Sequence, residues 1–240
     1  AVGYLALSTD DVGQHNVAIG RQALENLNIA TAANTYNTAV GSAAGNALTT
    51  GTDNTFVGGV AGDALTTGSD NVVVGAGALG TDTQGSGSVA IGRVALAAQN
   101  FTTAVTSNNV AVGREAGNDI TTGTSNTLIG ALAGDALTDA DQNVALGTNA
   151  LATDTLGSRS TAIGEGALLQ QNYATATNSL NTAVGFQSAL NITTGIQNTL
   201  IGANAGDALT DTDFNVAVGV AALGSDTKGE RSTALGYGAL

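Results

Sequence analysis

The sequence predicts an all-β fold, a parallel β-solenoid of the β-roll type with rungs of 17 and 21 residues. Two observations carry this prediction. The motif Asn-Thr/Val-x-Val/Ile/Leu-Gly recurs along the chain, for example at Asn16–Gly20, Asn37–Gly41 and Asn54–Gly58. Its closing glycines lie 17 residues apart at first and then follow the spacing 21-17-17-17 three times, a superrepeat of 72 residues. Such periods are typical of solenoids, in which stacked units share one continuous core.

The composition indicates a thin core built from small side chains. Among 240 residues there are 34 Gly and no Pro, Cys, Met or Trp, and aromatic residues make up only 3%. The apolar fraction of 42% is nevertheless too high, and too regularly spaced, for a disordered chain. The absence of cysteine excludes a disulfide framework and cysteine-based zinc sites.

The charge balance is strongly acidic, with 6 Lys+Arg against 19 Asp+Glu and a formal net charge of −13. Nucleic acids and anionic membranes are bound by basic surfaces, so neither is an expected partner. No apolar run is long enough to span a bilayer. We therefore expect an acidic, self-repelling exterior.

The repeats form a single array over residues 1–240, with superrepeats 20–91, 92–163 and 164–235. The chain opens partway through one motif and stops just after another. Repeat arrays usually carry polar caps at both ends. We expect these residues to be an excerpt of a longer fibre.

Within each motif the side chains alternate between two faces of a strand. Thr38 and Val40, at positions two and four, share one face, and Ala39 at position three points to the other. Position three also accepts Phe56, so both faces are apolar. Strands that are apolar on both faces belong to parallel sheets or packed interfaces. The closing glycine is expected at a sharp corner that needs backbone freedom.

A second segment completes each rung. Alanine lies three residues after each closing glycine, as at Ala44 and Ala61, with Ser188 as the sole exception. A polar turn rich in Thr, Asp and Gly then leads back to the next motif. We therefore expect two short strands and two turns in every rung. The first Asn of the motif is predicted to stack on its equivalents as a hydrogen-bonded ladder, interrupted where Ser88, Ser160 and Ser232 replace it.

The 21-residue rungs carry four additional residues in a loop, and their segments align so that a bulky residue occupies the same place in each: Ile29, Phe101 and Tyr173. Two interpretations are open. These three residues lie on loops that contact another surface, or they tuck against the solenoid or a neighbouring chain.

No constellation typical of catalysis or cofactor binding is present. His15 is the only histidine and lies in a turn-like stretch. The glycines recur at the end of every motif, so they do not form a nucleotide-binding signature. Carboxylates gather in turns, which leaves structural Ca²⁺ as an alternative at Asp82, Asp154 or Asp226, although solvated acidic turns explain them as well. We expect no catalytic, cofactor-binding or metal-binding residue, and no enzyme.

Paired threonines, such as Thr49–Thr50 and Thr66–Thr67, raise the alternative of ice binding. Adjacent residues of a strand point to opposite faces, however, whereas an ice-binding plane needs threonines on one flat face. Ice binding is therefore disfavoured.

The Asn/Ser-x-Ala-Val/Ile-Gly signature, followed by an alanine-containing segment and a polar turn, resembles the head repeats of trimeric autotransporter adhesins of the YadA-like type. It is also similar to the Asn-Thr-Ala-Val-Gly repeats of bacteriophage tail-fibre proteins. The resemblance covers essentially all 240 residues. It implies a left-handed parallel β-roll in which three identical chains associate side by side. The rung here is longer than the usual rung of that family.

The resemblance implies a structural segment of a long extracellular fibre on a bacterial cell surface, serving adhesion and attachment. Its partners would be further copies of the chain, as a homotrimer and as the rest of the fibre, and a host-surface protein or glycan. The alternative is the shaft of a bacteriophage tail fibre or whisker, carried on a virion. A solenoid that cleaves polysaccharide is a third class, and it is disfavoured because such enzymes need a groove lined by acids, bases and aromatic residues.

Overall fold

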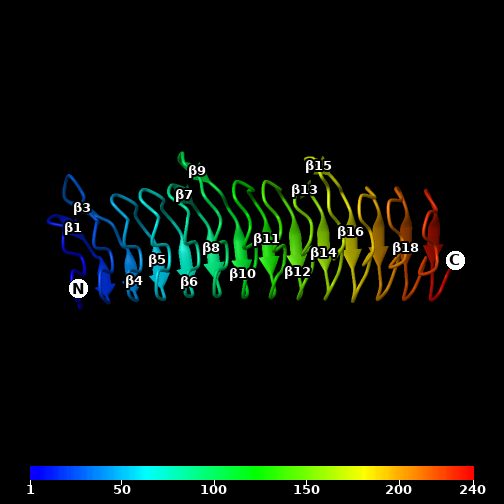
Figure 1. Ribbon diagram of the computed structural model, residues 1–240, viewed down its shortest axis with the longest axis horizontal. Coiled ribbons are helices and arrows are strands. Elements are labelled where there is room, and N and C mark those ends of the chain that lie inside the picture. Colours follow the sequence, from blue (N-terminus) through cyan, green and yellow to red (C-terminus); the bar gives the residue numbers. More distant parts are fainter. The chain divides into compact units, whose positions relative to one another are not determined.

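The computed structural model describes all 240 residues, and the chain forms two compact units, residues 1–122 and 123–240. Every strand pair within each unit is parallel, and there is no helix. Each unit is a parallel β-solenoid in which one short strand per rung stacks on the strand of the next rung (Figure 1). The predicted fold class is confirmed.

Unit 1 contains a main sheet of three-residue strands and four two-residue strands outside that sheet. The main strands are β2 (Val17–Ile19), β4 (Thr38–Val40), β5 (Thr55–Val57), β6 (Val72–Val74), β8 (Val89–Ile91) and β10 (Val110–Val112). The short strands are β1 (Gly13–Gln14), β3 (Ala33–Asn34), β7 (Gly85–Ser86) and β9 (Val105–Thr106).

Unit 2 repeats this organisation. Its main strands are β11 (Thr127–Ile129), β12 (Val144–Leu146), β14 (Thr161–Ile163), β16 (Thr182–Val184), β17 (Thr199–Ile201), β18 (Val216–Val218) and β19 (Thr233–Leu235). Its two short strands are β13 (Gly157–Ser158) and β15 (Thr177–Asn178).

The middle residue of every main strand points into the core. In β4 and β5 the Cα partners are Ala39 and Phe56, and both side chains are fully buried. The first and third residues of the strand therefore point outward, as their partial exposure shows. The register is strict because a shift by one residue would exchange the inner and outer side chains.

The closing glycines form a column at the end of the strands, and they are needed for two reasons. Gly58 has a φ of +137°, which side chains rarely adopt. A Cβ on Gly58 would also lie 2.7 Å from the carbonyl oxygen of Gly75 in the next rung. The predicted corner is confirmed, and close backbone approach between rungs adds a second requirement for glycine.

The second segment of the rung is not a strand, which corrects the prediction of two strands per rung. It consists of turns in which Leu24, at φ 50°, and the equivalent Gly45, at φ 58°, are left-handed. Its N–H groups still reach neighbouring rungs: the Leu24 N–H donates to the Ala44 oxygen at 3.1 Å. A left-handed leucine costs about 1–2 kcal/mol, which burial of its side chain, about 1.5–3 kcal/mol, offsets.

Large and small residues compensate each other inside the rungs. Phe56 fills the core of its rung, and a Cβ on Gly62 of the same rung would overlap its ring. Leu128 and Gly134 repeat the arrangement, since a Cβ on Gly134 would lie 2.7 Å from a Leu128 methyl carbon. Aliphatic residues seven places after the closing glycine also fill the core and are fully buried: Leu48, Leu65, Ile120, Leu137, Ile192 and Leu209.

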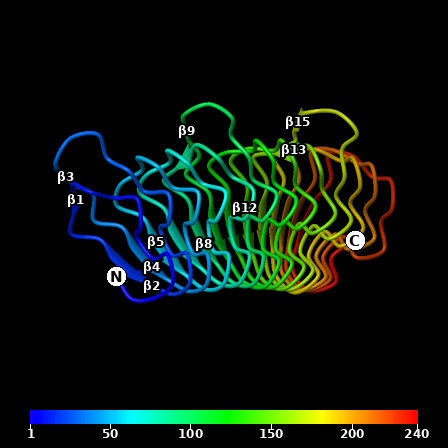
Figure 2. The same ribbon diagram turned by 60° about the vertical axis from the view of Figure 1, so that its left-hand side comes forward.

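The three long rungs carry the additional strand pairs. In unit 1, β1 pairs with β3 and β7 pairs with β9, and in unit 2, β13 pairs with β15. The chain ahead of β3, β9 and β15 extends beyond the shorter rungs of its own unit (Figure 2). The tips of the second and third loops, residues 102–104 and 174–176, are exposed and consist of threonine and alanine.

Candidate interaction surface

The outward face of the main sheet is the most distinctive surface of each unit. It is built from the first and third residues of every main strand. The first residue is always Val or Thr, and the third is always Val, Ile or Leu. Because successive strands pair in register, these residues form two straight columns, for example Thr127 over Val144 and Ile129 over Leu146. We call these two columns the outward face.

The outward face is apolar, uncharged and partly open to solvent. Val57, Ile129 and Leu146 are 37%, 37% and 43% exposed although they lie inside the stack. The chain carries a formal net charge of −13, yet none of it falls on these columns. A contiguous apolar patch on a soluble protein usually marks an interaction site.

The asparagines that precede the main strands, such as Asn37, Asn54 and Asn71, are fully buried and form the predicted ladder. The Asn37 Oδ1 atom accepts hydrogen bonds from the backbone N–H of Asn54 at 3.0 Å and from its side-chain amide at 3.1 Å. Asn54 binds Asn71 in the same way. Each amide also donates to a backbone oxygen of its own rung, such as that of Gly68. The ladder prediction is confirmed, and the role of these residues is structural.

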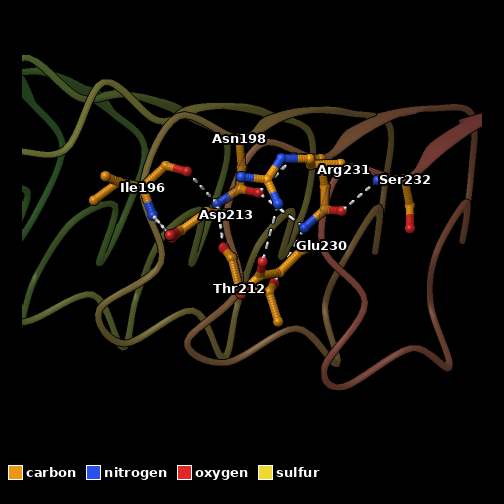
Figure 3. A network of polar contacts seen from close by, with 8 residues as sticks. Ile196, Asn198, Thr212, Asp213, Glu230, Arg231 and Ser232 are labelled. Carbon is orange, nitrogen blue, oxygen red and sulfur yellow. Dashed lines mark hydrogen bonds and ion pairs between the residues drawn. The ribbon is translucent and has the colours of Figure 1, made fainter.

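A second ladder, which the sequence reasoning missed, is formed by the residues that lie two positions before the first residue of each motif. Its side-chain oxygens accept the backbone N–H of the preceding rung. Figure 3 shows the Asp213 carboxylate receiving the Ile196 N–H at 2.8 Å, while the Arg231 N–H donates to the Asp213 backbone oxygen at 3.1 Å. The other side chains that act in this way are Ser69, Ser86, Asp141 and Ser158.

The threonine pairs are also structural. The first threonine of a pair donates its hydroxyl to a backbone oxygen one rung away, as Thr49 does to Thr66 at 3.0 Å and Thr66 does to Thr83 at 2.7 Å. These hydroxyls form a third ladder between rungs. They therefore hold the turns together and do not present a flat outer plane.

Where serine replaces the first Asn, a buried polar cluster takes over the ladder. We call Asp82, Ser88, Gln99, Ser107 and Asn109 the Asp82 cluster, and all five are fully buried. The Gln99 amide donates to the Asp82 carboxylate at 2.6 Å and to the Ser88 hydroxyl at 3.0 Å. Its oxygen accepts from the Asn109 amide at 2.9 Å. Gln99 thus bridges the gap that Ser88 leaves in the asparagine ladder.

The Asp154 cluster repeats this arrangement in unit 2 and comprises Asp154, Ser160, Gln171, Ser179 and Asn181. Gln171 donates to Asp154 at 2.6 Å and accepts from Asn181 at 2.8 Å. Asp154 also accepts the Gly157 N–H at 3.0 Å. The interpretation of Asp82 and Asp154 as solvated turn residues is wrong, because both carboxylates are buried among N–H donors. Asp226 remains partly open and accepts from Lys228 and Gly229.

Of the three predicted surface-contact residues, two lie inside. Phe101 and Tyr173 are only 6% and 4% exposed, and Ile29 is half-buried. The interpretation of Phe101 and Tyr173 as contact residues on the loop surface is therefore corrected: both tuck against the solenoid. The physical reason is that burying an aromatic ring removes a large apolar surface from water.

Tyr173 also makes polar contacts in the core, one of them to the following rung. Its hydroxyl donates to the Gly195 oxygen at 2.6 Å and lies 3.3 Å from the Asn181 amide. Burial, together with the negative charge of Asp154, raises the pKa of Tyr173 well above its usual range. The phenol is thus held in its neutral form within the core.

Two exposed ring contacts join neighbouring rungs. His15, in the predicted turn, is exposed and stacks on Tyr36, with ring centroids 5.2 Å apart and an interplanar angle of 10°. In unit 2, the Arg231 guanidinium lies 5.1 Å from the centroid of the Phe214 ring. These pairs join neighbouring rungs and contribute about 0.5–1 kcal/mol each at such exposed positions.

The structure shows no pocket, and no group of three or more His, Asp or Glu side chains is placed to hold a metal ion. It contains no helix that is long and apolar enough to cross a membrane. Comparisons with family models, with curated proteins and with solved structures found no match for this chain. The outward face is therefore the surface on which a functional proposal rests.

Proposed function

We propose that this chain is a structural repeat segment of a long extracellular fibre that projects from a bacterial cell surface and serves attachment. The rungs are linked by backbone hydrogen bonds and by three side-chain ladders, which suits a load-bearing element. The resemblance to adhesin head repeats supports the same role. The single observation that carries the proposal is the open, uncharged outward face.

In this proposal the outward faces of three chains meet in the fibre. A surface of Val, Ile, Leu and Thr without any charge is typical of the buried centre of an interface. Elsewhere the acidic chains repel one another, so copies approach most favourably through this face. The number three comes from the resemblance. The attachment partner is a host-surface protein or glycan, bound outside this interface.

Lysine substitutions on the outward face test this proposal. Ile129→Lys with Leu146→Lys places two charges on adjacent rungs of unit 2. In an isolated chain both side chains reach solvent, so the far-ultraviolet circular dichroism spectrum is expected to stay unchanged. In an assembly each unpaired charge costs several kcal/mol, so self-association is expected to weaken by at least about 1000-fold.

The measurement is the mass of the particle by sedimentation equilibrium over a range of concentrations. The matched control is Thr103→Lys with Thr175→Lys, which adds the same charge at two exposed loop tips. The proposal expects a trimer for the parent and the control, and a monomer for the outward-face variant. A monomeric parent, or a variant that associates as the parent does, contradicts it.

A further inference from the structure

The Asp154 cluster lies where a repeat array is most easily mis-stacked. Asparagine ladders are nearly identical from rung to rung, so an Asn can bind an Asn of any neighbouring rung equally well. A long rung can therefore be expelled as a loop while the rungs on either side stack on each other. Something must disfavour this slipped arrangement.

The buried carboxylate of Asp154 supplies a contact that only the correct neighbour satisfies. One donor, Gly157, lies in its own rung, whereas Gln171 and the backbone N–H of Tyr173 come from the long rung that follows. If that long rung were expelled, the carboxylate would stay buried without these donors. A buried charge that loses its partners is strongly destabilising.

The serine adds to this selectivity. Ser160 lacks the amide oxygen that an asparagine offers to the asparagine of the next rung. The oxygen of Gln171 replaces it by accepting from the Asn181 amide, while the Gln171 amide donates to the Ser160 hydroxyl. The 17-residue rung that would stack there after expulsion, which contains Asn198, has no glutamine at the position of Gln171. The Asp82 cluster has the same composition in unit 1 and the same contacts.

We infer that the Asp82 and Asp154 clusters fix the register of the stack, so that the second and third long rungs are retained and their loops project at the right place. The device consists of a buried aspartate and a serine, which are joined by a glutamine that lies 11 residues after the serine. It specifies one arrangement by making the alternative costly, a use of buried polar groups known from other repetitive assemblies.

The absence of cysteine from the chain allows register to be read by disulfide formation. Arg159 and Leu180 immediately precede Ser160 and Asn181, lie in adjacent rungs and are exposed. A pair of cysteines at these two positions reports the native register. A pair of cysteines at Arg159 and Gln197 reports the slipped register. In the native stack these two positions are two rungs, about 10 Å, apart, which is too far for a disulfide.

Both cysteine pairs are placed in the parent chain, in Asp154→Asn and in Gln171→Leu. The control Asp211→Asn changes an exposed aspartate of the same unit. Disulfides are formed under mild oxidation after refolding and identified by peptide mapping, with amide hydrogen exchange of β14 and β16 as a second readout.

The inference predicts the slipped disulfide in Asp154→Asn and in Gln171→Leu, with at least tenfold faster exchange in β16. It predicts only the native disulfide in the parent and the control. If Asp154→Asn and Gln171→Leu form only the native disulfide, or neither one, the clusters add stability alone and the inference is overturned.

Discussion

The first long rung differs from the two later ones in how it joins the rung before it. Asp10 is partly open and receives the Asn16 side-chain amide at 3.3 Å, and Leu27 fills the inner position. In the later rungs serine replaces Asn16, and Gln99 or Gln171 replaces Leu27. At these later rungs Asp82 and Asp154 are fully buried, and the glutamine amide binds each carboxylate at 2.6 Å.

The comparison teaches that the ladder can be continued in two ways. With asparagine, the ladder continues directly, since Asn37 donates its N–H to the Asn16 oxygen at 3.0 Å, and the inner residue can be apolar. With serine, the ladder needs the glutamine that lies 11 residues further along the chain. The bulky residue of the long rung changes as well, from half-buried Ile29 to buried Phe101 and Tyr173. The residues that differ therefore change together as one unit.

The largest expected difference is in the bulky residue. Phe101→Ala is expected to lower the free energy of unfolding of its rungs by about 3–5 kcal/mol, because it leaves a cavity in a closed core. Ile29→Ala is expected to lower it by only about 1–2 kcal/mol, because much of that side chain is already in water. Native-state hydrogen exchange of the neighbouring strands measures both. Equal losses at the two positions would remove the distinction between the rungs.

The next difference concerns the inner residue of the first long rung. Leu27→Gln is expected to destabilise that rung by about 1–3 kcal/mol, because the buried amide finds Asp10 already bound to Asn16. Adding Asn16→Ser frees the Asp10 carboxylate for the amide and is expected to recover at least half of the loss. The midpoint of thermal unfolding follows both variants. Additive losses in the double variant would show that the residues do not act together.

The smallest effect separates the two later rungs from each other. Tyr173→Phe makes the third rung like the second and removes a buried hydrogen bond, at an expected loss of about 0.5–1.5 kcal/mol near neutral pH. The pKa of Tyr173 is raised by burial, so the folded state holds the phenolic proton more tightly than the unfolded chain. Its contribution is fully present below the unfolded pKa of about 10 and is lost as the pH rises above it.

The parent is therefore expected to lose stability in unit 2 between about pH 10 and pH 12, and Tyr173→Phe to lose less over that range. Thermal unfolding at several pH values, followed by hydrogen exchange of β16 and β17, makes the comparison. A parallel alkaline decline in parent and variant would show that the phenol of Tyr173 does not ionise with unfolding.

The period of the motif was sufficient to predict the solenoid, the strands, the glycine corner and the asparagine ladder, because each repeats and each has a local physical cause. It did not decide which strand face is inside, since Thr38 and Val40 on one side and Ala39 on the other are all compatible with burial. It also misassigned the alanine segment as a strand. Alternating left-handed residues such as Leu24 leave no clear signal in composition.

The buried clusters were missed because a single aspartate followed by Thr and Gly is typical of a solvated turn. The signal was present in the internal comparison: Ser88 occurs with Gln99 and Ser160 with Gln171, whereas Asn16 occurs with Leu27. Residues that change together between repeats indicate contact between rungs. Such pairs are visible only when the superrepeats are aligned with one another.

Single-particle cryo-electron microscopy of the assembled 240-residue protein tests the central proposal most directly. The proposal predicts three chains whose outward faces meet, with Ile129 and Leu146 buried at the contact and the loops of the long rungs outside. A particle of one chain would contradict it. So would an assembly that leaves Ile129 and Leu146 in solvent.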